Sequence, residues 1–426
     1  MKSYLQMSKQ EQKDELALVC AEYEQLKTLG LKLDMSRGKP NYKQLDLSMD
    51  LLGQNPSDIV FTEKGVDARN YGELTGVEEA KQFFADVLGV EQKNIIIGGQ
   101  ASLALMYDCV VKALILGVLG GAKPWGAQGK IKFLCPAPGY DRHFAICEHF
   151  GMEMINIPML ETGPDMDLVK KYVESDASVK GIWCVPKYSN PQGIVYSDDT
   201  VRAFAKMNPA ADDFRIFWDN AYFIHFNKEP DTPLLNIFDA CREEGSEDMV
   251  YEFFSTSKIT FSGAGIAVLA ASENNIKFIT KQLSIQTIGN DKINQLRHVK
   301  YFKDVDGIKN HMKKHAAIVR PKFECVLENL DKEIAPREIG EWLNPNGGYF
   351  VSYDGLDGTA KRCVQLCKDA GVVLTGAGAA FPYGVDPDDK NVRIAPTYPD
   401  IEELAKCMEL FCICQRIAAL ELLISK

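Results

Sequence analysis

The sequence predicts an α/β protein with two lobes: a large lobe built on a mainly parallel sheet flanked by helices, and a smaller α+β lobe. Through the middle of the chain, apolar strands alternate with helical segments, which is typical of a parallel sheet covered by helices. Beyond about residue 300, charged helices alternate with short strands. At 426 residues, the chain is also too long for one simple core.

The N-terminal segment predicts one helix followed by a loop. Apolar residues recur at helical spacing through residues 3–30, and Gly30 can end that helix. A short extended piece is expected at residues 33–35. Residues 36–40, Ser-Arg-Gly-Lys-Pro, then end regular structure.

The large lobe takes its strands from short apolar runs. A turn at residues 71–76 opens a helix at 77–88, and a strand at 94–97 leads through two glycines into an apolar helix that ends near 118. Further strands are expected at residues 132–134, 154–157, 181–185, 215–218 and 250–254.

The smaller lobe follows a charged, helical stretch at residues 289–314, where we expect one long helix that leads into it. Its other elements are expected as helices at 311–330, 359–370 and 401–423, and as strands at 348–353, 372–374 and 391–395.

Composition excludes several classes of protein. The net charge is −11 and no basic stretch stands out, which argues against nucleic acid as a partner. The most apolar run, residues 113–122, is half the ~20 residues that a membrane helix needs. The start has no apolar export signal, and the 12 cysteines form no disulfide-like pattern. We therefore expect a soluble, cytoplasmic protein with reduced thiols.

Residues 254–258, Phe-Ser-Thr-Ser-Lys, place a lysine and hydroxyl groups at the end of an apolar strand, before a Gly-rich segment. A lysine there can form an imine with a carbonyl group, and the serines can hold a phosphate. Pyridoxal 5'-phosphate (PLP) needs both. Taken alone, a solvated turn lysine explains the stretch better, so the interpretation depends on the groups elsewhere in the chain.

Residues 97–102, Ile-Gly-Gly-Gln-Ala-Ser, run from a strand through glycines into a helix. The N–H groups at a helix start bind phosphate, and glycines let the backbone approach it. An ordinary tight turn fits equally well. The segment is neither a dinucleotide fingerprint nor a P-loop, because it lacks the spaced third glycine and no Gly-Lys-Ser/Thr follows.

Asp219 lies at the end of an apolar strand, where ligands of open α/β sheets bind. A carboxylate in an apolar site needs a cationic partner, and a pyridinium nitrogen is one. Tyr222 is close enough in sequence to reach the same ring. The alternative is an aspartate that caps the next helix.

Two further strand ends offer a polar or an aromatic group. Asn190 precedes a proline, which holds it out of helical conformation, so its amide can point into the site. Tyr140 can stack on a planar ring. A simple Pro/Gly turn and a tyrosine of the core are the alternative explanations.

The order of these motifs, completed by Asn-Val-Arg at 391–393, resembles the fold-type I PLP-dependent aminotransferases of the aspartate aminotransferase superfamily. The resemblance extends from residue 36 to residue 393. Within that superfamily the chain resembles most the MocR-type subgroup, through residues 36–40, 105–108, 138–143, 255–260 and 294–298.

The resemblance implies a seven-stranded main sheet and three parts of the chain. Residues 1–50 form an N-terminal segment that joins the small domain, residues 51–300 form the large PLP-binding domain, and residues 301–426 form the small α+β domain.

The resemblance also implies a role for each motif residue. Lys258 forms the Schiff base and moves the substrate proton, Asp219 pairs with the pyridine nitrogen, and Arg393 binds the substrate α-carboxylate. The other implied contacts are Tyr222 and Asn190 at the 3-oxygen, Tyr140 on the ring, Gly99, Gln100, Ala101, Ser255 and Ser257 at the phosphate, and Gly38 at the substrate. Tyr71 would reach the phosphate of a neighbouring subunit, which implies a homodimer with shared active sites.

One position departs from the superfamily pattern. An arginine that binds the cofactor phosphate usually lies eight residues after the lysine, and here that residue is Ile266. Lys292 and Arg297 are the candidates to supply the missing charge.

The function that fits best is an L-aspartate:2-oxoglutarate aminotransferase with a ping-pong mechanism. Arg37 or Arg297 would then bind the distal carboxylate of its dicarboxylic substrates. Two alternatives stay open: a PLP enzyme with another amino donor or with decarboxylase or β-lyase activity, and a non-catalytic binding module. The intact Lys258 and Asp219 argue against the module.

His311 and His315 have the spacing of two ligands on one helix face. Their segment offers no acid and two lysines, so we expect a solvated helix face and no metal site. The cysteines at 363, 367, 412 and 414 are expected in the core.

Overall fold

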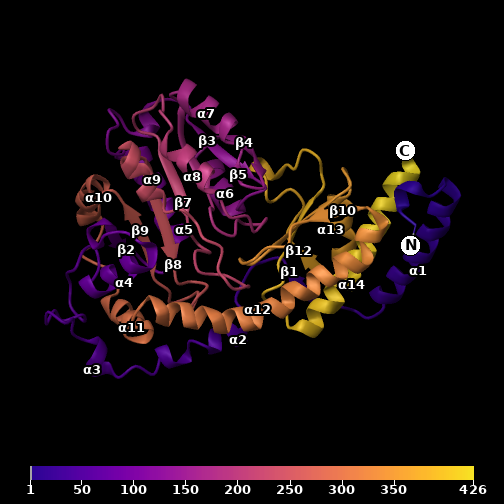
Figure 1. Ribbon diagram of the computed structural model, residues 1–426, viewed down its shortest axis with the longest axis horizontal. Coiled ribbons are helices and arrows are strands. Elements are labelled where there is room, and N and C mark those ends of the chain that lie inside the picture. Colours follow the sequence, from indigo (N-terminus) through magenta and orange to yellow (C-terminus); the bar gives the residue numbers. More distant parts are fainter. Residues whose placement is uncertain (1) are drawn as a thin grey trace.

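The computed structural model describes residues 2–426 and has two lobes, one of which contains the main sheet (Figure 1). Five of the strands in this sheet are parallel neighbours, and β9 runs antiparallel to both of its neighbours. In spatial order the strands are β2 (Ile95–Ile97), β9 (Ala267–Ala271), β8 (Val250–Ser255), β7 (Arg215–Asp219), β6 (Val179–Cys184), β3 (Lys132–Ala137), β4 (Glu153–Leu160) and β5 (Gly163–Pro164).

The predicted α/β class is confirmed, with differences in detail. Eight strands are hydrogen-bonded in this sheet, one more than expected, because the two-residue β5 pairs antiparallel with the end of β4. Strand β9 was not expected, since its sequence, Ala-Val-Leu-Ala-Ala, is rich in a residue that is depleted in strands. It forms because it is buried between β2 and β8.

The sheet is buried on both faces, as a parallel sheet requires. In β7, Ile216 and Trp218 belong to one apolar cluster, whereas Phe217 between them belongs to another. The helices of this lobe are α4 (Glu78–Leu88), α5 (Ser102–Ile115), α6 (Asp141–His149), α7 (Met166–Ser175), α8 (Asp198–Ala205), α9 (Ile237–Glu244) and α10 (Glu273–Gln286).

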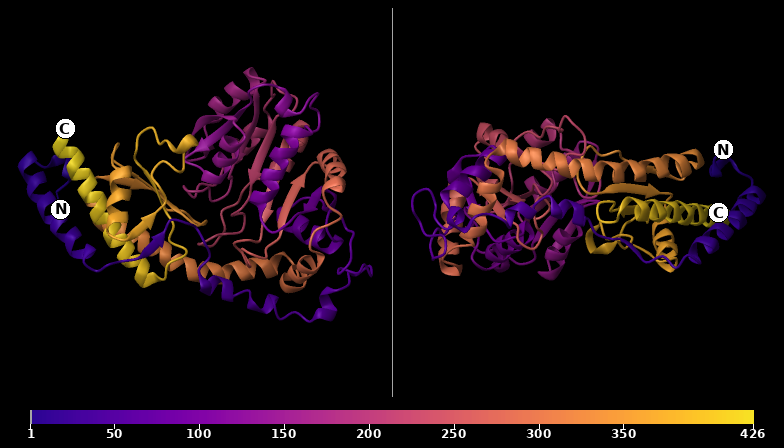
Figure 2. Two further views of the ribbon diagram at one scale, coloured as in Figure 1. Left: turned by 180° about the vertical axis from the view of Figure 1, so that it is seen from behind. Right: turned by 90° about the horizontal axis from the view of Figure 1, so that it is seen from below.

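The second lobe has its own apolar core, to which both ends of the chain contribute. Its strands are β10 (Gly340–Trp342), β11 (Val351–Gly355) and β13 (Asn391–Ile394), which form an antiparallel sheet, and β1 (Leu33–Met35), which pairs parallel with β12 (Val372–Leu374). Its helices are α1 (Lys9–Lys27), α13 (Ala360–Asp369) and α14 (Ile401–Ser425). The N-terminal helix α1 packs against α14 (Figure 2). This packing agrees with an N-terminal segment that joins the small domain. The division of the chain at residues 50 and 300 stays a prediction.

The segment between the lobes is not one helix as expected. Helix α11 (Lys292–Phe302) ends where Lys303 adopts a positive φ of 69°, and α12 (Val305–Glu333) begins after it. The Asp304 side chain accepts a hydrogen bond from the Gly307 N–H at 2.8 Å and so caps the new helix. Helix α12 then runs along both lobes (Figures 1 and 2).

Short helical pieces connect β1 to the large lobe: α2 (Tyr42–Asp46) and α3 (Pro56–Ile59). In the described part of the chain, we find no helix whose length and apolar character would let it cross a membrane.

The parallel strands end at one edge of the sheet, where open α/β sheets bind ligands. Asp219 is the last residue of β7, and Ser255 is the last residue of β8. Tyr140 follows β3 and Asn190 follows β6. The fold therefore gathers side chains that lie far apart in the sequence.

Candidate active site

Two adjoining cavities meet at Lys258. The inner one, of about 190 Å³, is lined by Asp219, Ser255 and the start of α5. The outer one, of about 410 Å³, opens toward Gly38 and Arg393 from the smaller lobe. The side chains that line both cavities are those of Tyr140, Asn190, Tyr222 and Lys258.

Lys258 projects from the turn after β8 and is half-buried. Burial lowers the pKa of its ammonium group, although the Asp219 carboxylate opposes that shift. Its Nζ lies 5.0 Å from the centre of the Tyr222 ring. A lysine with a lowered pKa is more often neutral, and the neutral amine is the form that attacks a carbonyl.

Asp219 is buried, and its two carboxylate oxygens have different surroundings. Its Oδ2 lies 3.1 Å from His143 Nε2, which must donate the hydrogen bond because a carboxylate only accepts. Its Oδ1 is buried without any partner. The His143 ring is held in place by stacking on Trp183 at 4.5 Å. A buried carboxylate oxygen without a partner is costly, so this atom fits a protonated ring nitrogen from a ligand.

The start of α5 faces the same cavity and has no side-chain cap. Ser257 Oγ donates to the Gln100 carbonyl at 2.9 Å and ties the lysine turn to this loop. A Cβ added at Gly265 would lie 3.0 Å from that carbonyl oxygen and 3.1 Å from Ser257 N, so only glycine fits there without a shift. The free N–H groups of the helix start suit a phosphate.

Two tyrosines and an asparagine line the wall of the cavities. Burial raises the pKa of Tyr140 to about 12, and burial raises the pKa of Tyr222 well above its usual value. Both phenols therefore keep their protons at neutral pH and can donate hydrogen bonds. Asn190 is buried, and its Oδ1 accepts from Arg393 Nη1 at 3.2 Å.

Arg393 extends from β13 in the smaller lobe and is buried. Its Nη1 lies 2.9 Å from Asp141 Oδ1, and its Nη2 donates to Thr375 Oγ1 at 3.3 Å. Its guanidinium carbon lies 4.9 Å from the centre of the Phe350 ring. A Cβ at Gly38 would overlap that ring, so any larger residue at position 38 would displace the ring that packs on the arginine.

Known proteins resemble the chain over nearly its whole length. A family model described as aspartate amino-transferase matches residues 7–426. A Mycolicibacterium smegmatis protein described as an aminotransferase is 46% identical over 94% of each chain. The aspartate aminotransferase of Corynebacterium glutamicum is 42% identical over 94% of this chain and 92% of its own. The crystal structure of an aspartate transaminase from that organism superimposes with a TM-score of 0.96, at 40% identity, over 98% of this chain and 99% of the other.

The chain belongs to the aspartate amino-transferase family.

It is thus a fold-type I, PLP-dependent aminotransferase, as the motif order indicated. The predicted site residues of this aminotransferase that line the two cavities are Arg37, Gly38, Ala101, Tyr140, Asn190, Asp219, Tyr222, Ser255, Ser257, Lys258 and Arg393. Gly99 and Gln100 lie in the loop just before Ala101. Tyr71 and Arg297 line neither cavity.

Among the site residues that sequence reasoning missed, three lie together at the start of α6. His143, Asp141 and Arg142 follow Tyr140 on α6; the first contacts Asp219, the second contacts Arg393, and the third lines the outer cavity. The segment Tyr-Asp-Arg-His carried part of the family resemblance, but nothing in it showed what its polar residues would contact.

Ile266, which stands where the superfamily has an arginine, has a structural role in this aminotransferase. Ile266 is buried, and its backbone forms two hydrogen bonds with Thr256. The Ile266 N–H donates to Thr256 Oγ1 at 2.9 Å, and the Thr256 N–H donates to the Ile266 carbonyl at 2.9 Å. Lys292 donates to the Gly72 carbonyl at 3.2 Å instead of reaching the cavity. Among the described residues, Lys258 is the only cation that lines the inner cavity.

The prediction of a solvated helix face at His311 and His315 is wrong. Both are buried, and their Nε2 atoms lie 3.1 Å apart. Gln44 Nε2 lies 3.1 Å from His315 Nδ1 and donates to Tyr349 Oη at 3.1 Å, and Tyr349 Oη donates to the Lys258 carbonyl at 3.2 Å. The histidines thus belong to a polar network behind the lysine turn. The cysteines at 363, 367, 412 and 414 are buried in the core, as predicted.

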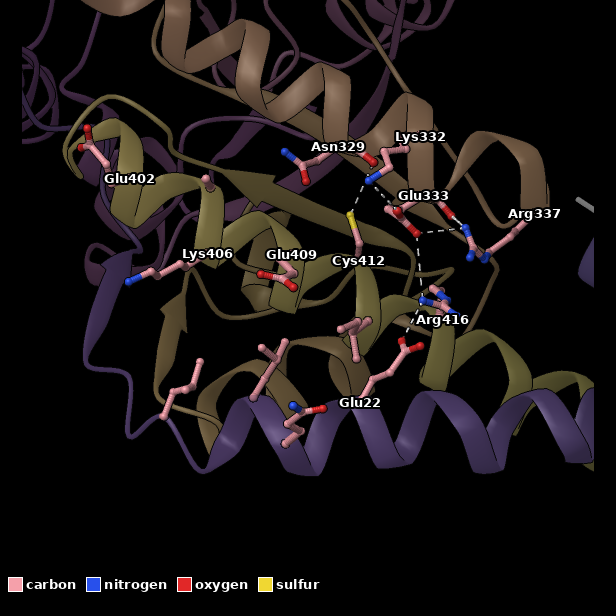
Figure 3. Close-up of a pocket in the computed structure, with 15 residues that line it drawn as sticks. Glu22, Asn329, Lys332, Glu333, Arg337, Glu402, Lys406, Glu409, Cys412 and Arg416 are labelled. Carbon is pink, nitrogen blue, oxygen red and sulfur yellow. Dashed lines mark hydrogen bonds and ion pairs between the residues drawn. The ribbon is translucent and has the colours of Figure 1, made fainter.

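A larger hollow, of about 870 Å³, lies far from this site between α1, α12 and α14 (Figure 3). Its buried arginines are already paired: Arg416 with Glu22 at 3.2 Å, and Arg337 with Glu333 at 3.2 Å. No residue of the main sheet lobe lines it. We therefore assign the chemistry to the cavities at Lys258.

Proposed function

We propose that the protein transfers the amino group of L-aspartate to 2-oxoglutarate, forming oxaloacetate and L-glutamate. The observation that carries this proposal is the charge of the outer cavity. Its basic residues are Arg37, Lys39, Arg142, Arg393 and the partly neutral Lys258, against one acid, Asp141. Such a surplus suits substrates with two carboxylates. The relative in Corynebacterium glutamicum is named an aspartate aminotransferase.

PLP fits the inner cavity in this proposal. Asp219 Oδ1 would meet the pyridinium nitrogen, and the start of α5 with Ser255 and Ser257 would hold the phosphate. Tyr222 and Asn190 would contact the 3-oxygen, and Tyr140 would stack on the ring. When bound, PLP withdraws electrons from the substrate Cα and so makes its proton acidic.

The residues of the chain supply the binding and the proton transfer. Lys258 would hold the cofactor covalently through Nζ, and the same nitrogen would carry the proton that leaves the substrate Cα. Its lowered pKa increases the fraction of the neutral amine, which is the form that accepts a proton.

Arg393 would bind the α-carboxylate with its planar, bidentate guanidinium group. Arg37 and Arg142 are both exposed and line the outer cavity, so we propose them for the distal carboxylate. Arg297 lines neither cavity of its own subunit and could act only across a dimer.

We propose a homodimer. Tyr71 is 80% exposed and lines neither cavity of its own chain, as expected for a residue that serves the phosphate of a partner subunit. Other large apolar side chains of this lobe are also exposed: Ile115, Leu116, Ile285 and Ile288. We further propose a cytoplasmic location, with which the twelve unpaired cysteines agree.

The substrate assignment is tested with purified holoenzyme and a panel of amino donors. With L-aspartate and 2-oxoglutarate, oxaloacetate should form, and aspartate should exceed alanine in kcat/KM by at least about a hundredfold, the effect of a paired distal carboxylate. Arg142→Gln or Arg37→Gln should reduce that preference. Release of CO₂, or of pyruvate and ammonia, would instead establish a decarboxylase or a β-lyase.

A further inference from the structure

Arg393, the proposed clamp for the substrate α-carboxylate, already holds a carboxylate of the protein. Asp141 Oδ1 lies 2.9 Å from Arg393 Nη1. The Arg393 side chain is 7% exposed, whereas the Asp141 side chain is 32% exposed. The acid is the first residue of α6 and belongs to the other lobe.

A buried guanidinium group needs a counterion when no substrate is present. Among the described residues, Asp141 is the only acid that lines the outer cavity and the only acid paired with Arg393. The other partners of the guanidinium, Asn190 and Thr375, are neutral. Asp141 therefore supplies the whole of the compensating charge there.

A substrate carboxylate at Arg393 would meet the negative charge of Asp141 at the same cation. Two carboxylates that share one guanidinium repel each other, so tight binding requires the acid to move away. Asp141 can do so because its side chain is partly exposed. Lys39 lines the same cavity and forms no ion pair within residues 2–426. It offers the displaced carboxylate a second position.

We propose that Asp141 is an exchangeable counterion: it neutralises Arg393 in the empty site and yields it to the α-carboxylate of the substrate. It is a positioning residue that lowers the affinity for substrate and product alike and so speeds their exchange. This inference rests on the proposed role of Arg393 in carboxylate binding.

The test measures binding of maleate, a dicarboxylate that cannot react, to the holoenzyme by calorimetry. Asp141→Asn keeps the shape of the side chain and removes its charge, so maleate should bind about tenfold more tightly than to the wild type. KM should fall for both substrates, and kcat should fall if product release becomes slow. Asp141→Glu should restore the wild-type affinity. Glu148→Gln, which removes an exposed charge from the same helix, should leave the affinity unchanged.

Thermal unfolding gives a second readout, the rise in Tm on addition of maleate, that a purely structural role would not produce. Without maleate, Asp141→Asn should unfold at a lower temperature, because Arg393 loses its counterion, and maleate should raise its Tm more than that of the wild type. Asp141→Ser serves as a second charge-free variant if the asparagine variant does not fold.

Unchanged or weaker maleate binding in both charge-free variants would overturn the inference, and Asp141 would then simply orient Arg393. This failure differs from failure of the proposed function. In that case the wild-type holoenzyme itself would not bind maleate and would not transaminate aspartate.

Discussion

His143 Nε2 donates a hydrogen bond to Asp219 Oδ2 at 3.1 Å, while the other oxygen, Asp219 Oδ1, is buried without a partner. One side of the carboxylate is thus fixed by the protein, and the other side is left for a ligand. His143 is fixed in turn, by its stacking on Trp183.

Replacing His143 should impair catalysis without removing the acid. His143→Phe keeps a flat ring on Trp183 but lacks the N–H donor, so Asp219 should lose its fixed orientation. We expect kcat to fall about tenfold to a hundredfold, the usual effect of losing a residue that orients a ligand-binding group. Steady-state kinetics with a saturating donor measure this effect. His149→Phe, on the exposed part of the same helix, is the control and should keep its kcat.

Gly38→Ala should weaken substrate binding through Phe350. The new methyl group would overlap the Phe350 ring, which lies 4.9 Å from the Arg393 guanidinium carbon. Because the arginine loses its packing, KM should rise about tenfold for both substrates, while kcat changes less. Gly376→Ala is a matched control, since Gly376 lines the same cavity with open space around its Cα. Equal kinetics for the two variants would contradict this explanation.

Glu252 should make stability depend on pH. This acid is buried within β8, and burial raises its pKa to about 7, although a hydrogen bond from Asn220 opposes the shift. The folded protein therefore holds a proton that the unfolded chain has released above its usual pKa of 4.5. The stabilisation of the folded state that comes from protonated Glu252 is complete below pH 4.5. It is lost as the pH rises to about 7.

Glu252→Gln mimics the protonated acid and should remove this dependence. At pH 8 the variant should exceed the wild type in free energy of unfolding by about 3 kcal/mol, the free-energy equivalent of the pKa shift. At pH 5 the difference should be about 1 kcal/mol or less. Urea unfolding at the two pH values measures it. A difference that does not grow with pH would show that Glu252 is not protonated at low pH.

The sequence predicted the elements with strong periodicity or apolar runs. Residues 401–423 form α14 (Ile401–Ser425), and the predicted strand at 215–218 lies within β7 (Arg215–Asp219). The break at Lys303 was not predicted, because it depends on one residue with a positive φ and on the cap from Asp304. Strand β9 was missed because its neighbours, rather than its own residues, make it a strand.

Within the site, the residues at strand ends could be predicted, since parallel strands bring their carboxyl ends to one edge. Asp219, Asn190 and Lys258 were found in this way. Asp141 could not be found, because its partner Arg393 lies 252 positions away in the other lobe. His315 could not be assigned either, because only the packing of α2 against α12 shows that it is buried.

Lys258 is the covalent anchor of PLP in the proposed mechanism. Borohydride reduction of the yellow holoenzyme, followed by peptide mass mapping, identifies the lysine that holds the cofactor. A pyridoxyl group should be found on Lys258, and Lys258→Ala should show neither the reducible absorbance band nor a labelled peptide. A pyridoxyl group on another lysine, or a full reducible band in Lys258→Ala, would rule out Lys258 as the anchor.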